Sequence, residues 1–252
     1  QPQRQADVSA ALGEAYFIQK KYDQAITALL PVKTQGEVAV WLGKSYMYLE
    51  QPQNAMPFLT QAIDAEVEDA EVYLLRAQIF YDQKFYENTL TDIQQAQQLG
   101  LTTGLVYALR GGAQYYLNKY DNAIKNLNKA LEKREGTDEI YYTLGNAQAA
   151  TKDFKNAIPN LKQAIKLSRN DLITYQHLGE AEYSVKNYAS AVEALDQAIQ
   201  LGANSVGVFE WRGNAKFFQH HKTAVDDLNQ AIALGSQDTL VYWNRAKFRL
   251  AQ

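Results

Sequence analysis

The sequence predicts an all-α fold of helix-turn-helix repeats, and three observations indicate it. Small residues recur at a nearly fixed spacing, apolar residues follow a helical period between them, and glycine and proline are scarce, with 14 and 5 residues in 252. A fixed period of roughly 20–50 residues is the signature of a repeat array. The low glycine and proline content argues against a loop-rich all-β fold or a long disordered linker.

The register of the repeat is set by two series of small residues. The first series lies in the second half of each unit, and its members are Ala25, Ala55, Thr89, Ala123, Ala157, Ala191 and Ala224. Their spacing is roughly 34 residues after a shorter first step, which lies within the range of repeat arrays. The second series precedes the first six of these by twelve residues, at Gly13, Gly43, Ala77, Gly111, Gly145 and Gly179. We expect these residues where the paired helices approach each other most closely.

Each unit is predicted to hold two amphipathic helices. In residues 138–171, apolar and small residues recur at helical spacing on both sides of a turn at Lys152-Asp153. Three Leu-Gly pairs indicate helix ends, with Gly100, Gly202 and Gly235 just past the cap. Pro31 lies in the second helix of the first, shorter unit, where proline ends or kinks a helix. We therefore expect an irregular packing step there.

The period and its residues resemble the tetratricopeptide repeat family. The clearest match is the unit with Tyr175, Leu178, Gly179, Tyr188, Ala191, Leu195 and Ala198. The resemblance implies a right-handed α-solenoid over residues 6–252, with a single domain of about seven repeats and one terminal helix. The predicted repeats are 6–35, 36–69, 70–103, 104–137, 138–171, 172–205 and 206–238, followed by a helix over 239–251. The resemblance also implies binding of peptides or proteins, usually in a concave groove lined by the first helices.

Two positions in each unit covary in chemistry. The residue before the small residue is leucine in some units and arginine in others, and arginine tends to face an acid or amide in the second helix. We predict ion pairs between Arg76 and Asp92, and between Arg212 and Asp226 or Asp227. Because they recur with the repeat, they are interpreted as structural rather than catalytic.

Nothing in the sequence favours catalysis, and no enzyme activity, cofactor or metal site is expected. The chain has no cysteine, and His220-His221 is expected in a turn, where adjacent histidines chelate a metal poorly. No nucleotide-binding, hydrolase, zinc-protease or calcium-loop motif occurs. The net charge of −3 argues against a strongly basic nucleic-acid binder, and no apolar run is long enough to span a membrane.

The first-helix positions that would line the groove carry eight acidic, two basic and ten aromatic residues. An acidic, aromatic groove favours a basic or neutral partner, with the rings as anchors. The alternative interpretation is that several rings only pack between repeats. The predicted partner-binding residues are Tyr48, Glu71, Tyr81, Tyr115, Tyr116, Tyr142, Asn146, Glu180, Tyr183, Glu210, Asn214 and Phe217.

Two ligand classes of the family are disfavoured. Co-chaperones that grip a C-terminal carboxylate share a lysine, asparagine and arginine clamp, and here Tyr142 and Asn146 keep the asparagine without the lysine. Sugar-transferase arrays share a ladder of asparagines, of which this chain keeps Asn244 alone among eight positions. A carboxylate-terminal chaperone tail is therefore not the expected partner.

The leading hypothesis is a non-catalytic protein–protein interaction scaffold that binds a partner segment in this groove, in assembly of a multiprotein envelope or secretion complex. The alternatives are an interaction arm of a larger enzyme or export machine, because the chain stops inside an amphipathic helix, and a self-associating module whose terminal helices form a homo-oligomer. The absence of cysteine and a first residue other than Met slightly favour a bacterial periplasm or envelope over the cytoplasm.

Overall fold

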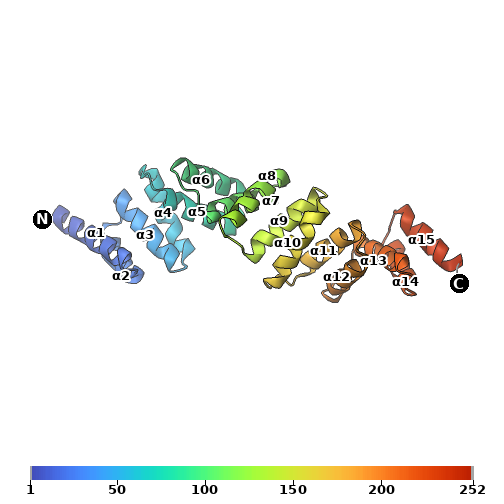
Figure 1. Ribbon diagram of the computed structural model, residues 1–252. Helices are drawn as coiled ribbons and strands as arrows, with labels where there is room; N and C mark the ends of the chain where they lie inside the picture. Colours follow the sequence, from blue (N-terminus) through green and yellow to red (C-terminus); the bar gives the residue numbers. More distant parts are fainter. Residues whose placement is uncertain (1, 251–252) are drawn as a thin grey trace. The chain divides into compact units, whose positions relative to one another are not determined.

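The computed structural model describes residues 2–250, and in this part of the chain all regular structure is helical (Figure 1). Contacts divide the chain into two compact units, one of residues up to 119 with 129–134 and one of residues 120–128 with those from 135 onward. The first unit holds α1 (Pro2–Ile18), α2 (Tyr22–Leu29), the 3₁₀ helix η1 (Leu30–Val32), α3 (Gly36–Tyr48), α4 (Pro52–Asp64), α5 (Ala70–Asp82), α6 (Tyr86–Gln98) and α7 (Gly104–Tyr116).

Helix α8 (Tyr120–Glu132) contributes residues to both units. The second unit holds α9 (Asp138–Ala150), α10 (Phe154–Lys166), α11 (Leu172–Ser184), α12 (Tyr188–Gln200), α13 (Val206–Phe218), α14 (Ala224–Ala233) and α15 (Thr239–Leu250). The all-α repeat fold predicted from the sequence is confirmed. The single-domain organisation and its exact repeat boundaries stay a prediction.

The first helix of several repeats begins at a residue whose side chain caps it. Asp69, Thr103, Thr137 and Asp171, at the same place in four successive repeats, accept hydrogen bonds from backbone N–H groups in the first turn of α5, α7, α9 and α11. These side chains satisfy donors that a helix leaves without a partner at its start. The sequence therefore fixes the start of each of these helices locally.

Small residues let the two helices of a repeat pack closely. A Cβ atom added at Gly43, Gly145 or Gly179 would lie 2.7, 2.8 or 2.5 Å from an atom of Leu59, Leu161 or Leu195. These leucines lie in the second helices and are fully buried. The close approach expected at the small residues is confirmed in these three repeats, and each of the three leucines belongs to a buried core cluster.

Several helix ends occur where glycine or proline in the sequence predicts them. Gly100, Gly202 and Gly235 have φ values of 91°, 100° and 95°, the left-handed conformation that ends a helix. In the first repeat, α2 ends at Leu29 and Pro31 falls in η1 instead of continuing the helix. Proline cannot donate the backbone hydrogen bond that an α-helix needs at this point, so the irregular step occurs where it was expected.

Candidate functional site

Within each unit, the first helices of successive repeats pack against one another and form a continuous row. In the first unit α1 contacts α3, α3 contacts α5, and α5 contacts α7. In the second unit α9 contacts α11, α11 contacts α13, and α13 contacts α15. All the predicted partner-binding residues lie on these first helices, those up to Tyr116 in the first unit and those from Tyr142 onward in the second. Each unit therefore presents its own row of candidate residues.

Stacked aromatic pairs join neighbouring repeats at the ends of the first helices. Tyr48 stacks on Tyr22 with ring centroids 5.1 Å apart, and Tyr116 stacks on Tyr86 at 4.7 Å. Phe218 stacks on Tyr188 in the same way at 4.9 Å. Each pair combines the start of a second helix with the end of the next first helix. Such stacking stabilises a pair by about 0.5–1.5 kcal/mol beyond the area it buries.

These rings also remain available to solvent. Tyr48 is 48% exposed, and Tyr116 and Phe218 are 38% and 39% exposed. Tyr81 is more enclosed, because its ring lies against Gly112 of the next first helix and forms edge contacts with Tyr86 and Tyr116. Both interpretations of the aromatic residues therefore have support in the structure, since the rings pack between repeats and still offer exposed edges.

A charged cluster surrounds Tyr48. The Lys44 ammonium is buried and lies 2.7 Å from both the Asp69 and the Glu71 carboxylates. The Tyr48 hydroxyl donates a hydrogen bond to Glu71 at 2.7 Å. This hydrogen bond to the carboxylate, with burial and the charge of Glu71, raises the pKa of Tyr48 to about 12. Lys44, one of the two basic residues at the first-helix groove positions, is thus neutralised inside the structure.

An acidic pocket lies on the first-helix face of the first unit. It has a volume of about 270 Å³ and is lined by Glu14, Glu37, Val40, Trp41, Val67, Glu68 and Asp69. Glu14, Glu37 and Glu68 are exposed and have no ion-pair partner among residues 2–250. Three unpaired carboxylates beside an indole ring form an environment that attracts a cationic side chain.

In the second unit, Tyr142 lies under a cation. The Arg169 guanidinium carbon is 4.0 Å from the centroid of the Tyr142 ring. Arg169 also pairs with Glu139 at 2.7 Å and with Asp171 at 2.8 Å. Burial raises the pKa of Tyr142 above its ordinary value, and the Asp171 charge adds to the rise. This predicted contact residue is consequently covered by the chain's own arginine.

Two buried amides form polar contacts between neighbouring first helices. The Asn146 Oδ1 lies 2.6 Å from His177 Nδ1, and Asn244 donates to Asn214 Oδ1 at 2.8 Å. Asn146 is 3% exposed and Asn214 is 1% exposed. The Asn146 Nδ2 has no hydrogen-bond partner within residues 2–250. Burial lowers the pKa of His177, which favours the neutral ring in this contact.

The remaining predicted residues of the second unit lie along α11 and α13. Glu180 is half-buried and has no hydrogen-bond or ion-pair partner in the described part of the chain, and burial raises the pKa of its carboxyl. The pKa of Tyr183 is raised by burial, against a hydrogen bond with Asn214. Glu210 accepts a hydrogen bond from Ser236, and Phe217 contacts the Trp243 ring at 6.4 Å. Glu180 is therefore the predicted contact residue whose carboxylate is open to a partner here.

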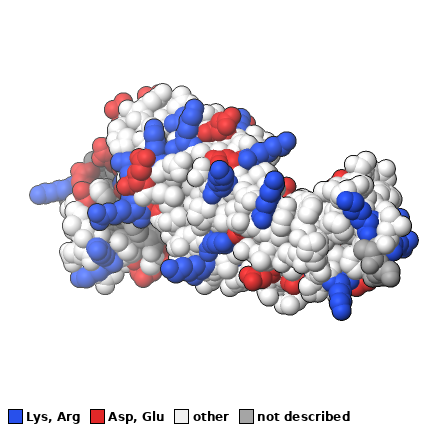
Figure 2. Space-filling model, turned by 45° about the vertical axis from the view of Figure 1, so that its right-hand side comes forward, with Lys and Arg blue, Asp and Glu red and all other residues white. Residues whose placement is uncertain are grey.

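The described part of the chain holds neither a candidate metal site of clustered side chains nor a helix able to span a membrane. Residues 2–250 contain no cluster of His, Asp and Glu side chains that could hold a metal ion. None of the helices in that range is long and apolar enough to cross a membrane. On the face in Figure 2, basic side chains are interspersed with acidic ones. The site therefore consists of stacked rings, carboxylates and buried amides.

Comparison with known proteins agrees with the repeat architecture. The sequence model of the tetratricopeptide repeat matches residues 36–66 and 138–171. A search of curated proteins finds no match. Among solved structures, the chain is similar to YrrB, described as a TPR protein with an unusual peptide-binding site, at 21% identity and a TM-score of 0.63. The alignment covers 75% of this chain and 97% of YrrB.

Two further structures show the same fold. The chain is similar to MamA, with 17% identity and a TM-score of 0.54 over 66% of this chain and 91% of that one. It is also similar to a tetratricopeptide repeat protein from Parabacteroides merdae, with 14% identity and a TM-score of 0.52 over 98% and 99% of the two chains.

Helix pairs that recur at a nearly constant spacing and stack through their first helices define an α-solenoid repeat protein. The match to the repeat model over residues 36–66 and 138–171, with the similarity to these structures, supports a tetratricopeptide repeat protein. Proteins with this fold are interaction scaffolds, and they bind proteins or peptides.

Proposed function

We propose that the chain is a non-catalytic scaffold that binds an extended or helical segment of a partner protein on its first-helix face. The partner segment is basic or neutral, and acidic side chains of the first unit select for this charge. The observation that carries this proposal is the set of carboxylates without ion-pair partners in the described chain, Glu14, Glu37 and Glu68 around Trp41. A protein gains nothing in folding stability from unpaired like charges so close together, and a cationic ligand relieves their repulsion.

The exposed rings supply the second part of the recognition. Tyr48 and Tyr116 offer aromatic edges in the first unit, and Phe218 does so in the second. Because their opposite faces are stacked, these rings are already ordered and lose little entropy on binding. Glu180 adds a half-buried carboxylate beside Tyr183, whose own hydroxyl is engaged with Asn214.

A selection from a random peptide library displayed on phage tests the charge preference. We expect peptides rich in lysine, arginine and aromatic residues to be enriched on the whole chain. A variant with Glu14→Gln, Glu37→Gln and Glu68→Gln is expected to bind the enriched peptides roughly tenfold more weakly, since each exposed charge contributes about 0.2–1 kcal/mol.

The matched control changes the same number of exposed acids on second helices, as Asp64→Asn, Asp121→Asn and Glu132→Gln. The test and control triple variants have the same net charge, so a nonspecific electrostatic effect weakens peptide binding equally in both. Enrichment of acidic peptides, or equal loss in both triple variants, would contradict the proposal.

A further inference from the structure

In several repeats a cation lies beside the aromatic ring that comes four residues before the small residue of the first helix. That small residue is Gly111 in α7, Gly213 in α13 and Ala246 in α15. The Arg212 guanidinium carbon is 5.7 Å from the Phe209 ring centroid, and that of Arg245 is 5.6 Å from the Tyr242 ring centroid. In α7 the equivalent ring, Tyr107, has the Lys129 ammonium at 5.3 Å. An aromatic ring with a cation over it is thus a recurring element of this chain.

The arginine of this element also joins two second helices. Arg212 donates from Nε to Asp227 in α14 at 2.9 Å, and from an Nη atom to Asp196 in α12 at 2.6 Å. Its side chain is only 14% exposed. The arginine therefore fills the space between the ring and the acids while it neutralises them.

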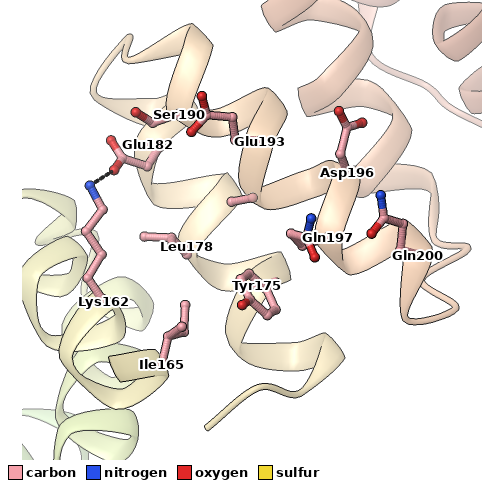
Figure 3. Close-up of a pocket in the computed structure, with 11 residues that line it drawn as sticks. Lys162, Ile165, Tyr175, Leu178, Glu182, Ser190, Glu193, Asp196, Gln197 and Gln200 are labelled. Carbon is pink, nitrogen blue, oxygen red and sulfur yellow. Dashed lines mark ion pairs between the residues drawn. The ribbon is translucent and has the colours of Figure 1, made fainter. Parts of the chain in front are cut away.

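The repeat formed by α11 and α12 has the ring without the cation. Tyr175, the equivalent of Phe209 in this repeat, has no cation over its ring in the described chain, and Leu178 stands where Arg212 stands in the next repeat. Across from it, Ala194 occupies the place of Asp227. Both replacements remove side-chain volume. The result is a pocket of about 590 Å³, lined by residues of α10, α11 and α12 (Figure 3).

The pocket combines an apolar floor with an acidic wall. Ile165, Leu178 and Ala194 contribute apolar surface. Tyr175 lies beside Ile165 and Leu178 (Figure 3). Glu193 and Asp196 lie along α12, with Gln197 and Gln200 further along the same helix (Figure 3). Glu193 is exposed and has no ion-pair partner among residues 2–250, while Asp196 keeps its side chain 42% exposed despite its pair with Arg212.

The one basic residue of the lining is already neutralised. Lys162 extends from α10 toward Glu182, and the ammonium and carboxylate are 2.6 Å apart (Figure 3). Glu182 is fully buried, so this pair ties Lys162 to a carboxylate inside the structure. The carboxylates of α12 therefore determine what charge the open part of the pocket accepts.

We propose that this pocket binds an arginine side chain of a partner protein. The guanidinium would donate to a carboxylate of α12, Glu193 or Asp196, while the side chain lies against Tyr175. The aliphatic part of the arginine would contact Ile165, Leu178 and Ala194. None of the predicted groove residues lines this pocket, so it is a second contact site, independent of the first-helix face.

Methyl NMR on the whole chain tests this assignment, with N-acetyl-arginine methylamide as the probe. The Ile165, Leu178 and Ala194 methyl groups report from inside the pocket. We expect saturable shifts of these methyl signals at millimolar probe, and much smaller shifts with the citrulline analogue, which has the same shape without the charge. Glu193→Gln is expected to weaken arginine binding roughly fivefold, as expected for loss of a charged hydrogen-bond acceptor.

The strongest control is a variant whose own side chains fill the pocket, called the self-filled variant. Leu178→Arg with Ala194→Asp copies the residues of the next repeat, so it restores a pattern that this chain already folds with. In this variant the Ile165 methyl group should no longer respond to the probe. Glu132→Gln, an exposed acid elsewhere, should leave binding unchanged.

The assignment is overturned if the arginine probe gives no shifts, or if the citrulline, lysine or leucine analogue gives equal ones. It is also overturned if the Ile165 response persists in the self-filled variant. Each of these results can occur whether or not peptides bind the first-helix face, so the two proposals fail separately.

Discussion

At the scale of single residues, the ion pairs between paired helices follow directly from the sequence pattern. Arg76 donates from Nε and Nη2 to Asp92 at 2.7 and 2.8 Å, and Arg212 binds Asp227 rather than Asp226. Asp92 is 2% exposed. The hydrogen bond to Asp92 raises the pKa of Arg76. In the second repeat, Leu42 and Phe58 occupy the two equivalent places, so apolar side chains form this contact between the paired helices.

Removal of one partner of the Arg76–Asp92 pair should destabilise the chain. Arg76→Ala leaves a buried carboxylate without a partner, and we expect a loss of about 3 kcal/mol in the free energy of unfolding. The double change Arg76→Leu with Asp92→Phe copies the second repeat and should recover most of the loss. Urea unfolding followed by circular dichroism measures both. A double variant as unstable as Arg76→Ala would refute this interpretation of the covarying positions.

The hydroxyl of Tyr48 provides a second residue-scale test. Its pKa of about 12 arises chiefly from the hydrogen bond to Glu71, which favours the neutral phenol. We expect Glu71→Gln to lower this pKa toward 10, as measured by NMR titration of tyrosines labelled at Cζ. Because the folded-state value is raised, the contribution to stability is present below about pH 10 and is lost as the pH rises through 12. An unchanged pKa would mean that Glu71 is not its cause.

The sequence could not predict which groove residues are already occupied by the chain itself. Tyr142 was expected as a contact residue, but Arg169 lies on its ring and bonds to Glu139 and Asp171. Arg169 lies in the turn after α10, a place that the helical period does not connect with α9. Similarly, the neutralisation of Lys44 by Asp69 depends on how one repeat stacks on the next, which repeat spacing alone does not give.

At the scale of helices, the ends show where sequence signals suffice and where they do not. Leu-Gly pairs predicted three helix ends, and all three glycines adopt the left-handed conformation. The chain adopts the same conformation at non-glycine residues, at Lys84, Asn118, Lys152 and Lys186 in the turns between paired helices. Asparagine favours this conformation, but at the three lysines the packing of the two helices imposes it and the residue type carries no signal.

Replacement of one of these residues by glycine should stabilise the protein. Lys152 has φ of 62°, and an L-residue in this conformation costs roughly 1 kcal/mol relative to glycine. We expect Lys152→Gly to raise the free energy of unfolding by about 1 kcal/mol. The reverse change, Gly202→Lys, should lower it by a similar amount because Gly202 has φ of 100°. Urea unfolding of both variants checks this, and changes of the opposite sign would contradict the assignment of these caps.

At the scale of the whole molecule, the repeat period determines the fold class, but not how the contacts divide the chain. The division falls near residues 119–135, although the repeat period continues through that region without a break. The pocket among α10, α11 and α12 could have been found from the sequence, because Leu178 and Ala194 are both smaller than the charged pairs of other repeats. Its depth and acidic wall required the positions of the helices.

Unfolding should also report the two units separately. In a linear array each repeat is stabilised only by its neighbours, so a local change acts mainly nearby. Trp41 lies in the first unit, and Trp211 and Trp243 lie in the second. In single-tryptophan chains, Arg76→Ala should lower the urea midpoint reported by Trp41 more than the midpoint reported by Trp211. Equal shifts at both tryptophans would show that the chain unfolds as one cooperative body.

We expect a partner segment to bind the first-helix face. Site-specific photo-crosslinking in the native host tests it directly, with a photoreactive phenylalanine introduced in turn at Tyr48, Tyr116 and Phe218, and at Lys125, Lys155 and Lys166 on second helices as controls. We predict that the same partner protein is captured from the three first-helix positions, and that its crosslinked peptides are basic or neutral. Capture from the second-helix positions alone would show that the partner does not bind the first-helix face.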